Sequence, residues 1–211
     1  MVKAQTAEGR VAVRQRRNRA ALVDAGYRVI SDKGVDAATM QEIAEIADVG
    51  AGTIYSYFKS KDDLAVAVME KVMHRLALRI EEVTDTFEDP AQVYAFGVRT
   101  VIEAATGDTR WRRLLNRSEV IADAMFRRMG PFAMRDLENA TKAGRFKISN
   151  VEVTWKMATY AIIGVGLAIT RGELPRSAID ETVVRCLCMA GVSVDQAHDL
   201  ANRPRPPLPK E

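Results

Sequence analysis

Residues 39–64 read TMQEIAEIADVGAGTIYSYFKSKDDL, and this stretch decides the fold of the N-terminal part of the chain. It begins with a short helix, because Thr39 is a natural N-cap and Glu42 follows at the spacing of a capping box. Apolar residues between 43 and 47 give that helix one face for a core. Gly50 then supplies either a free backbone turn or a tolerable N-cap for a second helix.

The second helix is expected from about residue 51 to residue 58. Ile54 and Phe58 are four residues apart, so both can face inward. The other positions carry small or hydroxyl-bearing side chains, which suit a helix that lies deep in the major groove of DNA. The candidate DNA-binding residues of this helix-turn-helix are Thr39, Gly50, Ala51, Gly52, Thr53, Tyr55, Tyr57 and Lys61.

This stretch resembles the N-terminal DNA-binding domain of TetR-type transcriptional repressors. The matching segments are ATMQEIA at 38–44, ADV at 47–49 and GTIYSYFKSKDDL at 52–64. Together with a preceding helix, the resemblance covers roughly 50 residues, a typical size for a small helix-turn-helix module. The chain departs from the commonest pattern at Gly50, where Ser or Thr often caps the recognition helix, and at Asp48, where Gly is frequent.

The charge of the chain is uneven, although its net charge of +3 over 211 residues is small. The first twenty residues hold six basic side chains and one acidic side chain, a net charge of +5. A basic arm over residues 1–13 suits phosphate contact or minor-groove entry, and Arg16 and Arg17 are further DNA-binding candidates. A solvated, disordered tail is the competing interpretation of the first residues.

The rest of the chain reads as helices throughout, so the expected fold is all-α. A three-helix DNA-binding domain at 14–60 precedes a larger helical domain for ligand binding and dimerisation at 61–197, and a Pro-rich tail occupies 198–211. The helices are expected at about 14–33 with Gly34 as the stop, 60–83, 90–105, 117–143 with a bend near Gly130, 151–171 and 177–191.

The last two of these helices are candidates for a dimer interface. Residues 157–170 are apolar on more than one face, so the helix must be covered on all sides, by the chain's own core and by a second copy. Two helices from each subunit would form a four-helix bundle, an arrangement that the resemblance also implies. Both helices could instead be core in a monomer, and the sequence does not fix their rotation. The interface candidates are Gly164, Val165, Ile169, Val184, Leu187 and Cys188.

The helices between these two regions carry Met and aromatic side chains, which give apolar and adaptable walls to a small-molecule pocket. Ordinary core packing explains any single one of them equally well. The candidate ligand-binding residues are Phe96, Trp111, Met125, Phe126, Met129, Trp155 and Tyr160.

An enzyme is the competing class of function. The sequence shows no Gly-rich phosphate loop and no nucleophile elbow, and its two histidines have no metal ligands at a useful spacing. Cys186 and Cys188 diverge on a helix and are expected to be small buried hydrophobes. We therefore expect no cofactor and no metal.

The first twenty residues are polar and contain no apolar stretch of the signal-peptide type, which favours the cytoplasm. The longest apolar run, at 160–169, is too short to span a bilayer, so no membrane partner is expected. The sequence predicts a homodimeric regulator, most consistent with a repressor that binds a two-fold operator and that a small, largely apolar effector releases. An adaptor protein with a degenerate DNA-binding domain is the alternative.

Overall fold

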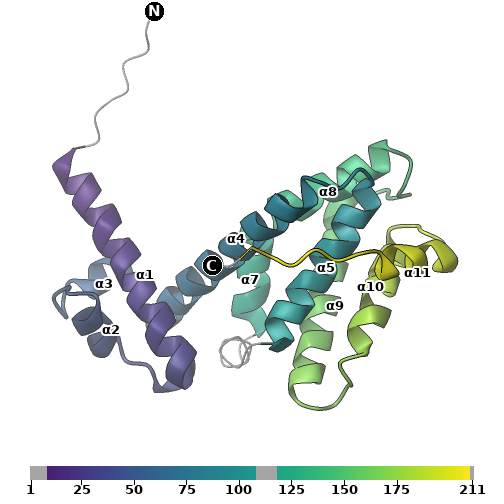
Figure 1. The fold of residues 1–211 in the computed structure, drawn as a ribbon. Coiled ribbons are helices and arrows are strands. Elements are labelled where there is room, and N and C mark those ends of the chain that lie inside the picture. Colours follow the sequence, from purple (N-terminus) through teal and green to yellow (C-terminus); the bar gives the residue numbers. More distant parts are fainter. Residues whose placement is uncertain (1–8, 108–117, 210–211) are drawn as a thin grey trace, which may run out of the picture. The chain divides into compact units, whose positions relative to one another are not determined.

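The computed structural model describes residues 9–107 and 118–209, and within these ranges it contains ten helices and no strand (Figure 1). The predicted all-α fold is therefore confirmed. The chain forms two compact units, Met1–Val68 and Met69–Glu211. Helix α4 (Lys61–Thr84) runs from the first unit into the second, so the boundary lies inside this helix and not at its start. The first two turns of α4 belong to unit 1 because Leu64 and Val68 pack against Gly26.

Unit 1 consists of α1 (Arg10–Ala37), α2 (Met40–Ile46), α3 (Ile54–Tyr57) and the first turns of α4. Gly34 interrupts α1 with a φ of 85°, which confirms the predicted stop at this residue. Helix α1 begins four residues earlier than predicted, so residues 10–13 of the predicted disordered arm are helical. Arg and Ala favour a helix here, and Val13 N–H donates to Gly9 O at 3.2 Å in the first turn.

Two predicted helix caps of unit 1 are present. Thr39 Oγ1 accepts from Glu42 N–H at 3.2 Å, and Ser60 Oγ accepts from Asp63 N–H at 3.1 Å. The Glu42 carboxylate pairs with Lys33 Nζ, which joins α2 to the end of α1. The largest fully buried side chains of this unit come from all four helices and are Leu22, Ile30, Ile43, Ile54 and Leu64.

Unit 2 is built around α5 (Pro90–Gly107). Helix α5 packs against α8 (Gly130–Lys142), α9 (Val151–Thr170), α10 (Ala178–Met189) and α11 (Val194–Asn202). Helix α7 (Ser118–Arg128) packs against α8 and α9. The helix predicted at 117–143 is thus divided in two at Met129, where the following Gly130-Pro131 begins a new helix.

Helix α11 was not predicted from the sequence, and its end lies inside the predicted tail. Ser193 Oγ caps it by accepting from Gln196 N–H, and its Leu200 and Ala201 are buried. The tail therefore starts after Asn202. The segment that follows also makes contacts with unit 2: Arg205 pairs with Glu103, and Pro209 O accepts from Arg79 Nε at 2.8 Å. The Pro-rich segment up to residue 209 thus reaches α4 along α5.

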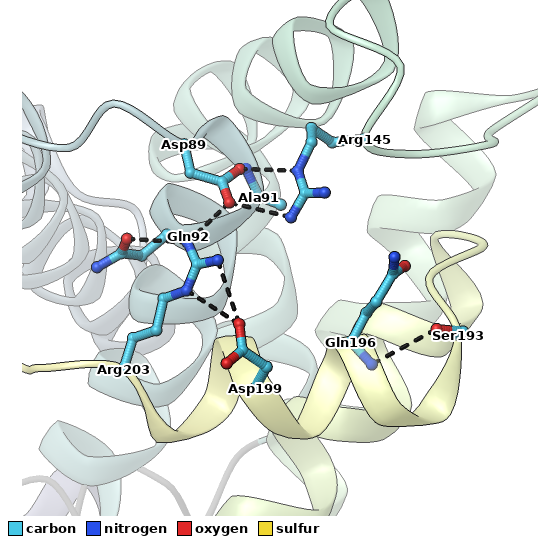
Figure 2. Close-up of polar contacts among 8 residues, drawn as sticks. All are labelled: Asp89, Ala91, Gln92, Arg145, Ser193, Gln196, Asp199 and Arg203. Carbon is cyan, nitrogen blue, oxygen red and sulfur yellow. Dashed lines mark hydrogen bonds and ion pairs between the residues drawn. The ribbon is translucent and has the colours of Figure 1, made fainter.

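One carboxylate, that of Asp89, joins three parts of unit 2 (Figure 2). It caps α5 by accepting from Ala91 N–H at 3.0 Å. Arg145 Nε and Nη2 donate to its two oxygens at 3.0 Å each, and Arg203 Nη1 donates at 2.7 Å. Burial raises the pKa of Asp89, but these hydrogen bonds outweigh it and leave the pKa below the ordinary value of 3.8.

Helix α9 is long and apolar enough to cross a membrane by length and composition alone. A core helix passes the same test, and the inward residues of α9, such as Trp155, Ala158 and Ile162, are buried against the rest of unit 2. The apolar character of α9 is therefore explained in part by its place in the bundle.

Candidate nucleic-acid interface and ligand pocket

The turn between α2 and α3 requires an unusual backbone at Asp48. Its φ of 53° lies in the left-handed region, and it is the only residue other than glycine with positive φ in the part of the chain that the structure describes. This conformation explains why glycine suits the position, and Asp tolerates it better than most residues. Val49 N–H then donates to Ala44 O at 3.0 Å, which closes the end of α2.

The strain at Asp48 leads to a prediction about stability. Asp48→Val is expected to lower the free energy of unfolding of unit 1 by about 1–2 kcal/mol, because a β-branched side chain is strongly disfavoured at positive φ. Asp48→Gly is the matched control and should keep or slightly raise the stability. Thermal unfolding followed by circular dichroism measures both, and equal melting temperatures for the two variants would contradict this reading of the turn.

Helix α3 is shorter than predicted, since residues 51–53 form a turn and only Ile54–Tyr57 are helical. Gly50 supplies no side-chain cap, and Gly52 is a poor helix former, so the first turn does not become regular. Thr53 N–H donates to Gly50 O at 2.7 Å and Phe58 N–H to Ile54 O at 3.0 Å. Of the four residues of α3 only Ile54 is buried, and the buried Phe58 follows directly after the helix.

The inward and outward faces of this segment agree with the prediction. Ile54 is fully buried and Phe58 is 3% exposed, whereas Tyr55 is 58% exposed. Arg19 of α1 lies over the Phe58 ring, with its guanidinium carbon 5.2 Å from the ring centre. Tyr57 is half-buried. The other outward candidates are exposed, namely Thr39, Gly50, Ala51, Gly52, Thr53 and, on α1, Arg16 and Arg17. Their contact with DNA stays a prediction.

Lys61 has a structural role that the sequence did not reveal. Its Nζ donates to Asp36 O at 2.7 Å and to Ala38 O at 3.1 Å. The ammonium group therefore caps backbone carbonyls at the end of α1, where a positive charge is favourable. One of its three N–H donors is left for a phosphate, so a Lys61 substitution would change stability as well as DNA affinity.

A pocket in unit 2 lies among α4, α5, α8 and α9. Its cavity is about 40 Å³, and the empty space including the part open to solvent is about 470 Å³. This volume is large enough for a few water molecules. Apolar side chains make most of the wall, and the residues that line the pocket are Ala77, Ile80, Glu81, Val93, Tyr94, Gly97, Val98, Val101, Met129, Phe132, Ala133, Asp136, Trp155 and Ile162.

The charges on this pocket are compensated by one arginine. Arg135 donates to both carboxylate oxygens of Glu81 and also pairs with Asp136. The hydrogen bonds to Glu81 raise the pKa of Arg135, so the guanidinium group stays protonated and positively charged. Burial raises the pKa of Asp136, and the hydrogen bond from Arg135 only partly offsets this effect. Glu81 and Arg135 also join α4 to α8 beside the pocket.

Of the six candidate ligand residues that the structure describes, only Met129 and Trp155 line this pocket. Phe96 lines a different, smaller cleft with Arg99 and Leu200, and Met125 is core. Tyr160 is 60% exposed on the outer side of α9, where its ring meets Phe126 at 5.8 Å, so these two do not belong to the pocket. Trp111 lies outside the described residues. Tyr94, which also lines the pocket and was not predicted, has no sequence signal beyond apolar spacing.

The candidate interface residues also separate into two groups. Val184 and Leu187 are buried at 2% and 0% exposure inside unit 2, so they do not lie on a free surface of the chain, and this part of the interface prediction is corrected. Cys188, Val165 and Ile169 are half-buried, and Gly164 is exposed. Gly164 lies on an outward apolar stripe of α9 that also carries Val153, Met157 and Tyr160.

The two cysteines differ in their surroundings. Cys186 is buried, and burial raises its pKa to about 12, whereas Cys188 is half-buried. The predicted burial thus holds fully for Cys186 alone. In the ranges 9–107 and 118–209, no group of three or more His, Cys, Asp or Glu side chains is placed to hold a metal ion.

Comparison with known families agrees with both units. Residues 22–68 match the bacterial regulatory proteins of the tetR family, and residues 89–203 match the tetracyclin repressor-like C-terminal domain. The second match alone spans more than half of the chain. The chain therefore belongs to the TetR family of helix-turn-helix transcriptional regulators.

Individual curated relatives match over part of the chain. The transcriptional repressor KstR of Mycolicibacterium smegmatis is 32% identical over 116 residues, which are 55% of this chain and 56% of KstR. The regulator BetI of Rhizobium meliloti is 45% identical over 58 residues, 28% of this chain and 29% of BetI. The chain thus spans about half the length, or less, of these curated relatives.

Solved structures match over a longer range. RolR in complex with resorcinol has a TM-score of 0.83 and 27% identity, and the match covers 93% of this chain and 100% of RolR. FadR of Bacillus subtilis in complex with stearoyl-CoA has a TM-score of 0.60 and 19% identity, over 81% of this chain and 97% of FadR. The FadR likeness is one of fold alone.

Proposed function

We propose that this chain is a repressor that binds a two-fold operator as a homodimer in the cytoplasm, and that a small, largely apolar effector releases it. The observation that carries the DNA-binding part is the α3 surface, where Tyr55 is exposed beside the buried Ile54. Thr53 and Tyr57 flank it with hydroxyl groups that can meet base edges and phosphates. The repressor KstR among the relatives supports the choice of repression.

The effector part of the proposal rests on the pocket of unit 2. A largely apolar cavity with a few polar groups is the usual form of a small-molecule site. The likeness to RolR, whose structure contains resorcinol, supports a small effector. Helix α4 contributes Ala77, Ile80 and Glu81 to the wall and continues into unit 1. An effector that prefers a different packing of α4 would therefore bias the position of the DNA-binding unit.

The proposed release is a population shift. A dimer reads two half-sites when its recognition helices match successive major grooves, about 34–36 Å apart. An effector that favours another setting of α4 needs to weaken operator binding by only a few kcal/mol, in the range of ordinary allosteric coupling.

The recognition segment gives the test of this function. Tyr55→Ala is expected to weaken operator binding by about 1–3 kcal/mol, because it removes a specific contact in the groove. The operator is first selected from random duplexes with the purified protein, and affinities are then measured by fluorescence anisotropy. Tyr55→Phe is the matched variant that removes only the hydroxyl group.

The alternative function, an adaptor with a degenerate DNA-binding unit, predicts a different result. In that case no duplex would be enriched in the selection, and Tyr55→Ala and Thr53→Ala would leave any DNA affinity unchanged. Unchanged affinity for both variants at a selected operator would also remove the assignment of α3 as the recognition helix.

A further inference from the structure

An ion pair joins two of the helices that line the α4–α5–α8–α9 pocket. Arg135 Nη1 of α8 donates to Glu81 Oε2 of α4 at 2.9 Å, and Arg135 Nη2 donates to the other carboxylate oxygen, Oε1. The guanidinium group is also held from its own helix. Nη2 donates to Asp136 Oδ1 at 2.8 Å, and the guanidinium carbon lies 5.8 Å from the centre of the Phe132 ring. Of these three partners, only Glu81 belongs to α4.

This ion pair lies on the side of the pocket that is open to solvent. The lining residues of α9, Trp155 and Ile162, are buried. Arg135 does not line the pocket itself, but its partners Glu81 and Asp136 do, and both are half-buried. The half-buried lining residues come from α4, α5 and α8 and are Glu81, Val93, Gly97, Phe132, Ala133 and Asp136. The ion pair therefore connects α4 to α8 on the open side.

The pocket must widen to enclose an organic ligand. Its cavity is about 40 Å³, whereas ligand pockets in proteins are usually about 300–1,000 Å³. Widening on the α9 side would disturb the close-packed core around Trp155 and Ile162. On the open side, the pair of Arg135 and Glu81 resists the movement. A separation of α4 and α8 by about 1 Å would take the 2.9 Å contact beyond the length of a good hydrogen bond.

We propose that Arg135 and Glu81 form a clamp that stabilises the contracted pocket, and that the clamp opens when a ligand fills the pocket. Arg135 is a positioning residue, because it fixes Glu81, and with it α4, against α8. Helix α4 continues from Glu81 into the DNA-binding unit. In the proposed release mechanism, the contracted setting of α4 is the one that operator DNA favours. The inference rests on the proposed function, because it names the contact that regulates the effector site.

Loss of the clamp should increase the fraction of molecules in which the pocket is widened. A partly exposed, bidentate ion pair stabilises one state over another by a factor of about three to five, the upper end of the range for surface pairs. When the contracted state dominates, this factor raises the population of the widened state almost in full and hardly lowers that of the contracted state. The accessibility of the pocket is therefore the sensitive measurement.

Thiol labelling of a reporter inside the pocket measures this accessibility. Val98 is buried and lines the pocket, so Val98→Cys places a thiol of similar size there. The full chain is treated with methyl methanethiosulfonate, and peptide mass spectrometry separates position 98 from Cys186 and Cys188. Arg135→Gln and Glu81→Gln should each accelerate labelling at position 98 by about three- to fivefold. Arg135→Lys keeps the charge but not the bidentate contact, so its effect should be smaller.

Two matched variants and an internal reference separate the clamp from a general loosening of unit 2. Glu82→Gln removes an exposed carboxylate beside Glu81, and Lys142→Gln breaks an exposed ion pair within α8. Both should change labelling at position 98 by less than about twofold. Cys186 is buried on α10 outside the pocket lining, and its labelling rate should stay the same in every variant. The double variant of Arg135 and Glu81 should label as fast as either single variant, because both substitutions remove the same contact.

Three results would overturn the proposal. An unchanged rate at position 98 in both Arg135→Gln and Glu81→Gln would show that the pair does not hold the pocket closed. Equal acceleration at position 98 and at Cys186 would show a general loss of stability. A saturating amount of a selected operator should slow labelling at position 98 by about fivefold or more, because coupling between two sites is reciprocal. An unchanged rate with operator bound would show that the clamp is not coupled to DNA.

The same measurements distinguish this inference from the proposed function. If Arg135→Gln and Glu81→Gln accelerate labelling as expected but no duplex is enriched in the selection, the clamp stands and the DNA-binding function is wrong. If the wild type binds a selected operator but both variants label at the wild-type rate, the clamp is wrong and the repressor function stands.

Discussion

The substitution Met157→Glu is expected to dissociate the proposed dimer and to weaken operator binding by at least about a hundredfold. Met157 is 54% exposed on the apolar stripe of α9, between the similarly exposed Val153 and Tyr160. In a two-fold interface the substitution places one unpaired carboxylate from each subunit in an apolar contact, which costs several kcal/mol. A monomer reads one half-site, so tight binding is lost although α3 is unchanged.

Sedimentation velocity and fluorescence anisotropy check the two parts of this prediction. Val194→Glu is the matched control, because Val194 is 51% exposed at the start of α11, away from the stripe, where a carboxylate suits the helix dipole. The control should remain dimeric and bind DNA as the wild type does. A Met157→Glu protein that stays dimeric would place the interface on another surface.

Asp89→Ala is expected to lower the free energy of unfolding of unit 2 by about 2–3 kcal/mol. The variant loses the cap of α5 and leaves Arg145 and Arg203 without their shared carboxylate. Chemical denaturation measures the change. Asp85→Ala removes an exposed carboxylate from the same connection and should change the stability by less than about 0.5 kcal/mol.

The pH dependence isolates the charge of Asp89. Its pKa is lower in the folded chain than the ordinary value of 3.8, so its charge stabilises the fold above that value and this contribution disappears as the pH falls through the folded pKa. Asp89→Asn can still cap α5 but carries no charge. The stability difference between the wild type and Asp89→Asn should therefore be largest above about pH 5 and shrink as the pH falls below 3.8. A constant difference would show that the ion pairs contribute nothing.

Local signals in the sequence were sufficient for most helix ends. Thr39 and Ser60 cap their helices as expected, Gly34 stops α1, and Asp89-Pro90 begins α5. Each of these ends depends on a side chain or backbone conformation within a few residues, which a single sequence displays directly.

Helix α11 and the beginning of α3 show where such signals failed. Ser193 and Gln196 have the spacing of a capping box, which would have indicated α11, but the prolines that follow suggested a tail. A nine-residue helix is marginal alone, and Leu200 and Ala201 stabilise it only through burial against the bundle. In α3 the error is the opposite one. The apolar spacing predicted a helix over residues 51–58, but Gly50 and Gly52 keep its first residues in a turn.

The functional surfaces of unit 2 depend on helix rotation, which composition does not fix. Val184 and Leu187 face the core of unit 2, whereas Met157, which was not an interface candidate, faces outward on α9. Tyr160 was assigned to the pocket but lies on the outward stripe, and Tyr94 lines the pocket without being selected. When a helix is apolar on both sides, its sequence does not indicate which residues pack in the core, contact a second subunit or line a ligand pocket. Only the packing of the neighbouring helices distinguishes these roles.

The contact of Pro209 O with Arg79 of α4 has a practical consequence for experiments on this protein. A purification tag or fluorescent protein fused at the C-terminus would follow Pro209 closely in sequence, and Pro209 contacts the helix that is proposed to carry the effector signal. Such a fusion could bind both DNA and ligand and still respond abnormally, because its bulk would pull on the segment that lies along α5. Effector titrations should therefore use protein from which any C-terminal tag has been cleaved, and a tagged and an untagged sample should be compared directly.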